Sequence, residues 1–146
     1  MMRDGQIYRD LEAPGAEVIE ALAAETLAQM PEPFRSWVKD VVVKIEDFPS
    51  DEIIDEMGLE SAFELLGLYQ GVAIGEKTSD HLSGLPDMIF LYRRPMLDYW
   101  SEHHETLAAV VRHVLIHEIG HHFGLSDDDM ERIETMMEDG APAAVH

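Results

Sequence analysis

A run of apolar residues at helical spacing near the end of the chain constrains the fold more than any other feature. Its members are Leu107, Val110, Val111, Val114, Leu115 and Ile119. Residues that recur at this spacing line one face of a helix. The pattern predicts a long helix that starts near Ser101 as its N-cap and runs to about Phe123. Gly124 follows at the position where a helix ends on a left-handed residue.

This helix carries the sequence His117-Glu118-Ile119-Gly120-His121. Four residues of an α-helix advance about 400° and about 6 Å, so His117 and His121 project from nearly the same face. This spacing suits two imidazole ligands of one tetrahedral metal ion. Glu118 is rotated by about 100° from His117, which places its carboxylate beside the metal, where it can deprotonate a bound water.

A catalytic zinc site needs a third protein ligand. Asp127 lies three residues after Gly124 and completes the pattern His-Glu-x-x-His-x-x-Gly-x-x-Asp. In shuffled chains of this composition, His-Glu-x-x-His arises in about one in twenty, and the extended pattern in about one in three thousand. The predicted zinc ligands are therefore His117, His121 and Asp127. Glu118 is the predicted catalytic base.

Other residues compete for a place in this site. The acidic candidates for the third ligand are Asp128, Asp129, Glu131 and Glu134. The offset of the extended pattern favours Asp127 over all of them. His113 lies one turn before His117 on the same helix face. It is either an additional or supporting group of the metal site or a surface histidine without a role.

The other segments predict a mixture of helices and short strands. Helices are predicted over residues 15–30, 50–57 and 128–138, and strands over residues 41–45 and 88–92. The stretch 65–74 is apolar but interrupted by glycines, and we expect it to be irregular, with a strand only from Leu68 onward. Gly120 lies inside a helix, where it costs on the order of 1 kcal/mol relative to alanine. A neighbouring backbone or strand is expected to approach it closely.

Several segments of the chain together match the pattern of a known family. They are residues 67–71 (Gly-Leu-Tyr-Gln-Gly), 85–87 (Leu-Pro-Asp), 91–95 (Leu-Tyr-Arg-Arg-Pro) and 117–127. From about residue 31 to 137 the sequence resembles the small bacterial zincin-like metallopeptidases, which have a minimal zincin fold. The last segment resembles the extended metzincin motif, with aspartate in place of the third histidine. The resemblance implies an α+β fold with a small mixed sheet against the active-site helix, and a zinc-dependent peptidase.

In zincins a strand at the edge of the sheet pairs with an extended substrate. Residues 88–92 are the candidate for this strand. An ordinary core strand is the equally open alternative, because an apolar run alone does not distinguish an edge strand from an interior one.

Four further polar side chains have both a functional and a structural interpretation. Arg93 and Arg94 either grip a substrate carboxylate or form surface ion pairs. Tyr69 and Tyr92 either donate to a reaction intermediate or pack as aromatic core residues. The structural interpretation is favoured for all four.

The composition limits the partners and the compartment. Thirty acidic residues against ten basic ones give a formal charge of -20, which disfavours nucleic acid and membrane surfaces and leaves a peptide or protein substrate. The chain has no cysteine, so a metal must bind imidazole and carboxylate. No apolar segment has the length of a signal peptide or a membrane span, and a cytoplasmic protein is expected. The 146 residues suit a single domain, with flexible ends at about 1–14 and 140–146.

The sequence thus predicts a zinc-dependent metallopeptidase in which Glu118 activates a water molecule. The alternative is a non-proteolytic regulatory or partner-binding module that retains a zincin site. Glu118 favours the first, since a purely structural site needs no base beside its ligands.

Overall fold

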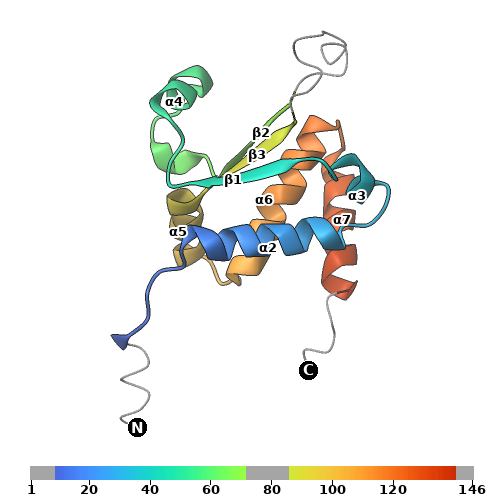
Figure 1. Cartoon of the computed structure of the whole chain (residues 1–146), viewed down its shortest axis with the longest axis horizontal. Helices are drawn as coiled ribbons and strands as arrows, with labels where there is room; N and C mark the ends of the chain where they lie inside the picture. The colour runs from blue at the N-terminus through green and yellow to red at the C-terminus, as the bar shows by residue number, and fades with distance from the viewer. Residues whose placement is uncertain (1–8, 72–85, 141–146) are drawn as a thin grey trace.

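The computed structural model describes residues 9–71 and 86–140 (Figure 1). The helices are α2 (Ala16–Gln29), α3 (Phe34–Trp37), α4 (Asp51–Met57), α5 (Arg93–Glu102), α6 (Leu107–His122) and α7 (Asp127–Gly140), with the 3-10 helix η1 (Ala62–Glu64). The strands are β1 (Val42–Glu46), β2 (Gly67–Gln70) and β3 (Met88–Tyr92). The predicted α+β class with a small mixed sheet is confirmed. The two ends that we predicted to be flexible are about 1–14 and 140–146, and most of their residues lie outside the described ranges.

The strands form one sheet in the order β1-β3-β2. β3 is parallel to β1 and antiparallel to β2, with Ile89 opposite Val43 on one side and opposite Tyr69 on the other. Of the two interpretations left open for residues 88–92, the core strand is therefore the correct one, and the substrate-binding edge is wrong. β3 is the central strand, and Ile89 and Leu91 are fully buried. The strand at the edge nearest α6 is β2, within the stretch that we expected to be mostly irregular.

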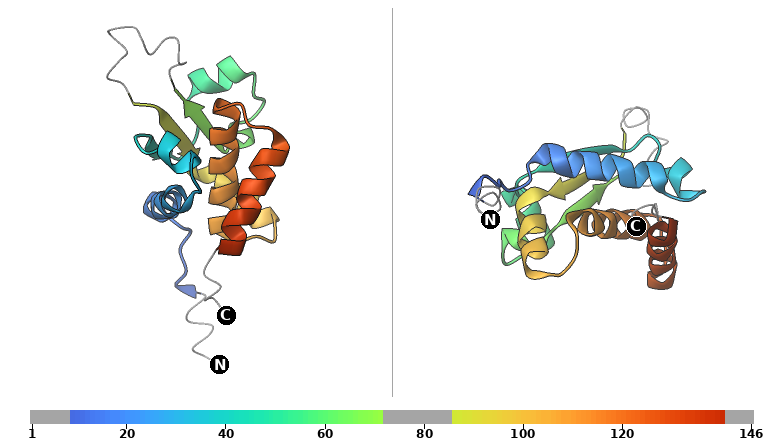
Figure 2. Two further views of the ribbon diagram at one scale, coloured as in Figure 1. Left: turned by 90° about the vertical axis from the view of Figure 1, so that its right-hand side faces the viewer. Right: turned by 90° about the horizontal axis from the view of Figure 1, so that it is seen from below.

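Two helices, α2 and α6, pack against each other and against the sheet, α2 beside β1 and α6 beside β2. Figure 2 shows α7 running alongside α6, so that α6 lies between the sheet and α7. The largest fully buried side chains come from α2, β3 and the three C-terminal helices and include Ile19, Ile89, Met96, Leu115, Ile119 and Met130. The described helices include none that is both long and apolar enough to cross a membrane.

The motif helix α6 begins at Leu107, and the prediction of an N-cap at Ser101 is wrong. Ser101 lies in the last turns of α5, where its hydroxyl donates to the carbonyl of Asp98 at 2.8 Å. The N-cap is Thr106, whose hydroxyl accepts from the backbone N–H of Ala109 at 3.1 Å. The helix therefore starts with the first residue of its apolar repeat.

The end of α6 follows the prediction. Gly124 has a φ of 75°, the left-handed conformation that reverses the chain after a helix. Two residues later, Ser126 and Asp129 cap α7 reciprocally: the Ser126 hydroxyl accepts from the Asp129 N–H at 3.1 Å, and the Asp129 carboxylate accepts from the Ser126 N–H at 3.4 Å. The turn therefore brings α7 back along α6.

Gly120 is where α7 comes closest to α6. A Cβ built on Gly120 would lie 2.6 Å from Cγ of Met130 and would also overlap its sulfur. The close approach predicted at Gly120 is real, but its source is the Met130 side chain of α7 rather than a backbone or a strand. The absence of a side chain at position 120 sets how closely the two helices pack.

Candidate active site

The two motif histidines lie one turn apart near the end of α6. Their ring centroids are 5.9 Å apart, with the ring planes at 80°. His117 is partly buried, with 29% of its side chain exposed, whereas His121 is exposed. Their role as zinc ligands stays a prediction.

Glu118 points from α6 toward the sheet. Its carboxylate accepts a hydrogen bond from the backbone N–H of Tyr69 in β2, at 3.1 Å. Burial raises the pKa of Glu118, and the hydrogen bond from Tyr69 and the nearby His121 oppose this rise. The predicted base is thus fixed by its contact with a strand that is distant in the sequence.

The outer edge of β2 faces this carboxylate because of the strand register. The N–H of Tyr92 donates to the carbonyl of Leu66 at 2.9 Å, and the polar groups of successive residues in an antiparallel strand alternate in direction. Leu68 therefore bonds to β3, whereas Gly67 and Tyr69 direct their backbone groups outward. The N–H of Tyr69 is the one that Glu118 accepts.

A different set of ligand-type side chains meets on the side of α6 that faces α7. Nδ1 of His113 lies 2.9 Å, and Nε2 of His117 3.1 Å, from Oε1 of Glu134. Each of these three side chains offers one atom that could bind a metal ion, and the three atoms all lie within 4.8 Å of one another. Burial, reinforced by His113, lowers the pKa of His117, and the Glu134 carboxylate opposes this effect. Glu134 was among the competing third ligands in the sequence.

Asp127 is the first residue of α7 and is exposed. It stands after the turn at Gly124, as the sequence pattern requires, but neither Asp127 nor His121 belongs to the group around Glu134. Their assignment as ligands together with His117 stays a prediction.

A model of a known protein family matches this chain. The family model is described as zincin-like metallopeptidase and covers residues 38–137, which include the whole sheet, α5, α6 and most of α7. The chain belongs to this family. No protein with a curated description matches the sequence. Membership in the zincin-like metallopeptidases implies a bound metal, typically zinc, and peptide or protein substrates.

A second layer of contacts holds β2 against the motif helix of this zincin-like chain. The ring of Tyr69 stacks on His122 with centroids 3.9 Å apart, and its hydroxyl donates to Asp87 at 2.8 Å. Burial and the Asp87 carboxylate raise the pKa of Tyr69. Sequence reasoning left both His122 and Asp87 out of the site. Asp87 lies in one of the segments that carry the family resemblance, which was the signal available for it.

The remaining candidates of the zincin-like chain have structural contacts. Tyr92 is buried, and burial together with the charges of Glu46 and Glu118 raises its pKa to about 12. Arg93 donates from Nε to the carbonyl of Pro14 at 2.7 Å and pairs with Asp47 at 3.4 Å. The guanidinium of Arg94 lies 5.4 Å from the ring centre of Phe48. These contacts agree with the structural interpretation of the two arginines and of Tyr92.

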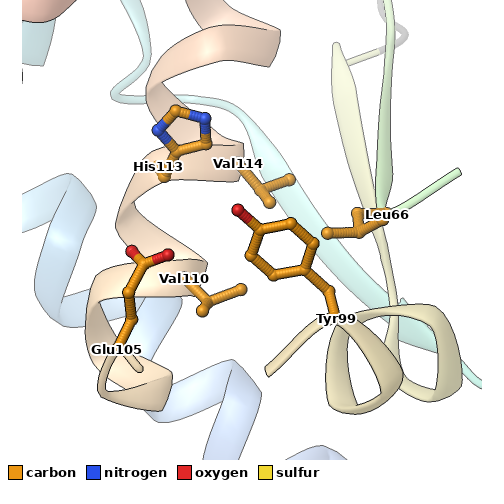
Figure 3. Close-up of a pocket in the computed structure, with 6 residues that line it drawn as sticks. All are labelled: Leu66, Tyr99, Glu105, Val110, His113 and Val114. Carbon is orange, nitrogen blue, oxygen red and sulfur yellow. The ribbon is translucent and has the colours of Figure 1, made fainter. Parts of the chain in front are cut away.

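A pocket of about 280 Å³ opens beside the motif helix. Its lining residues are Leu66, Tyr99, Glu105, Val110, His113 and Val114. Figure 3 shows the hydroxyl of Tyr99 directed toward α6, with the valines and Leu66 forming an apolar wall and Glu105 and His113 at the polar side. Because His113 also contacts Glu134, the pocket adjoins the histidines of this zincin-like site.

Proposed function

We propose that this chain is a zinc-dependent peptidase in which His117, His121 and Asp127 hold the metal and Glu118 is the catalytic base. The observation that carries the proposal is the position of Glu118, a partly buried carboxylate on the motif helix that accepts a hydrogen bond from Tyr69 at the outer edge of β2. A base is needed where a peptide backbone and a metal-activated water meet. Family membership supports the same reaction class.

The donor chemistry fits zinc. The chain has no cysteine, and two imidazoles with one carboxylate are the ligand set of many catalytic zinc sites. The two rings stand one helical turn apart, and Asp127 begins the helix that follows the turn at Gly124. His117 has to exchange its contact with Glu134 for the metal.

When bound, zinc supplies Lewis acidity, which polarises a carbonyl group and makes water a stronger acid. Glu118 then takes up the proton of the attacking water and delivers it to the leaving amine. The N–H of Tyr69 holds the carboxylate of Glu118 in one orientation during the approach of the substrate. The aromatic stack of Tyr69 on His122 keeps this part of β2 against α6.

The substrate peptide binds in extended form along the outer edge of β2. The outward carbonyl of Tyr69 offers a hydrogen bond to the peptide, as in strand addition to other sheet edges, whereas Gly67 is buried against Val114 of α6. The pocket beside His113 lies between Leu66, which precedes β2, and the motif helix. A side chain of the peptide enters it.

The decisive experiment compares the wild type with Glu118→Gln in a cleavage screen with proteome-derived peptides, after zinc loading. Glutamine keeps a side-chain oxygen for the N–H of Tyr69 but is no base, so we expect zinc binding and folding to persist while cleavage falls by about 10²- to 10⁴-fold. Glu25→Gln, which removes an exposed carboxylate on α2, is the matched control and keeps full activity.

Two outcomes would contradict the proposal. If the wild type binds zinc but cuts no peptide that Glu118→Gln spares, the chain is the non-proteolytic alternative. If the wild type binds no stoichiometric metal and His117→Ala changes nothing, the metal site itself is wrong.

A further inference from the structure

His113, His117 and Glu134 meet where α6 and α7 pack against each other. His113 and His117 lie one turn apart, with ring centroids 4.1 Å apart. Glu134 approaches both from α7, and its Oε1 atom lies 2.9 Å from one imidazole nitrogen and 3.1 Å from the other. Only His117 also belongs to the predicted zinc ligands.

We infer that these three side chains form a second binding position for a divalent cation of the zinc class, which competes with the predicted site for His117. Two imidazoles and a glutamate are a known zinc ligand set. Zinc bonds of about 2.0–2.1 Å at tetrahedral angles place neighbouring ligand atoms about 3.3 Å apart. The two separations from Glu134 to the imidazole nitrogens are a few tenths of an ångström shorter, so a small outward movement of the Glu134 side chain admits the ion.

The position is open to solvent on one side. The exposed fractions of the side chains are 50% for His113, 29% for His117 and 19% for Glu134. An ion can therefore enter without unfolding the helix pair and complete its coordination with water. The formal charge of -20 raises the local concentration of cations around the whole molecule.

The two positions exclude each other because Nε2 of His117 can bind one metal at a time. A cation bound by His113, His117 and Glu134 leaves His121 and Asp127 without the third ligand of the predicted site. The chain then carries a metal but lacks the catalytic arrangement that we propose above. This inference concerns metal binding alone and does not depend on peptidase activity.

The test is a calorimetric titration of the metal-free protein with zinc chloride. One double variant, His121→Ala/Asp127→Asn, removes the unshared ligands of the predicted site. A second, His113→Ala/Glu134→Gln, removes those of the second position, and His117→Ala removes the shared one. A control double variant, His104→Ala/Glu25→Gln, deletes an exposed imidazole and an exposed carboxylate outside both sets.

We expect His121→Ala/Asp127→Asn to bind one zinc at least tenfold more tightly than His117→Ala does. Adding His113→Ala and Glu134→Gln to that variant should lower its affinity to that of His117→Ala, while the control binds like the wild type. If His121→Ala/Asp127→Asn and His117→Ala have the same affinity, the second position does not exist, whereas the predicted site stands.

Other results separate the two sites further. If His121→Ala/Asp127→Asn binds zinc as tightly as the wild type and His113→Ala/Glu134→Gln does not, the second position is the principal one and the predicted ligand set is wrong. Circular dichroism reports whether each variant folds. If the double variant in the second set unfolds, Glu134→Gln alone in the His121→Ala/Asp127→Asn background gives the same comparison, and an unchanged affinity there overturns the inference.

Discussion

Gly120 and Gly124 are needed near the end of the motif helix for different physical reasons. At Gly120 an added Cβ would collide with Met130, so the position requires space. At Gly124 an added Cβ would meet nothing within 4 Å, but the φ of 75° disfavours any residue with a side chain. One glycine lets α7 approach, and the other turns the chain toward it.

Gly120→Ala should destabilise the protein through its collision with Met130. We expect a net loss of about 1–3 kcal/mol from overpacking, although alanine alone would favour the helix by about 1 kcal/mol. The measurement is urea unfolding of Gly120→Ala, Met130→Ala and the double variant. In the Met130→Ala background, Gly120→Ala should lower the free energy of unfolding by less, or should raise it.

Gly124→Ala is the matched control for this cycle. It should cost about 1–2 kcal/mol from backbone conformation alone, with the same value in both backgrounds. Equal costs of Gly120→Ala with and without Met130 would contradict the steric explanation.

At the scale of the element, α7 carries both Asp127 and Glu134, and its start determines where they lie. The reciprocal hydrogen bonds of Ser126 and Asp129 satisfy backbone donors at this start. Arg132 also donates to Asp129 at 2.7 Å, and this hydrogen bond is the main cause of the lowered pKa of Asp129. The helix is thus fixed at the end where it leaves the turn.

Ser126→Ala should lower the free energy of unfolding by about 1 kcal/mol, because it removes an N-cap acceptor. Ser101→Ala is the matched control, since the hydroxyl of Ser101 caps no helix start and only returns to the carbonyl of Asp98. Its effect should stay within about 0.5 kcal/mol. Thermal or urea unfolding measures both, and a larger loss at Ser101 would contradict the observed start of α6.

The elements themselves were predictable where the signal is local. The apolar run Met-Ile-Phe-Leu-Tyr predicted β3 with its observed bounds, because its β-branched and aromatic members favour a pleated strand wherever it lies. Its central place depends on pairing with β1 and β2, which are distant in the sequence. The contact between His117 and Glu134 depends on how closely α7 packs at Gly120, and the contact between Glu118 and Tyr69 depends on β2 lying against α6. The local periodicity of the sequence predicts neither of these two contacts.

At the scale of the whole molecule, excess negative charge and metal binding act on the same equilibrium. A ligand that binds only the folded chain stabilises it by an amount set by the ratio of its concentration to its dissociation constant. A cation also reduces the mutual repulsion of thirty acidic side chains. These two effects differ in their dependence on the ion.

Zinc at a free concentration one hundred times its dissociation constant should stabilise the chain by about 2.7 kcal/mol, and EDTA should remove this gain. Urea unfolding with zinc, with magnesium at the same concentration, and with EDTA measures it. Magnesium should have a much smaller effect, because it prefers oxygen ligands and retains its waters. An equal effect of the two ions, or an undiminished zinc effect in His117→Ala, would indicate charge screening rather than a site.

The hydrogen bond between Glu118 and the N–H of Tyr69 affects how the motif is interpreted across evolution. The carboxylate that we propose as the base also fastens the edge of the sheet to the motif helix. A descendant of this chain that gave up catalysis would still be under selection for a hydrogen-bond acceptor at this position. Retention of Glu118 in a lineage can therefore reflect the hydrogen bond to Tyr69 as well as catalysis. A glutamine at this position would identify a lineage that has lost catalysis but still needs the hydrogen bond.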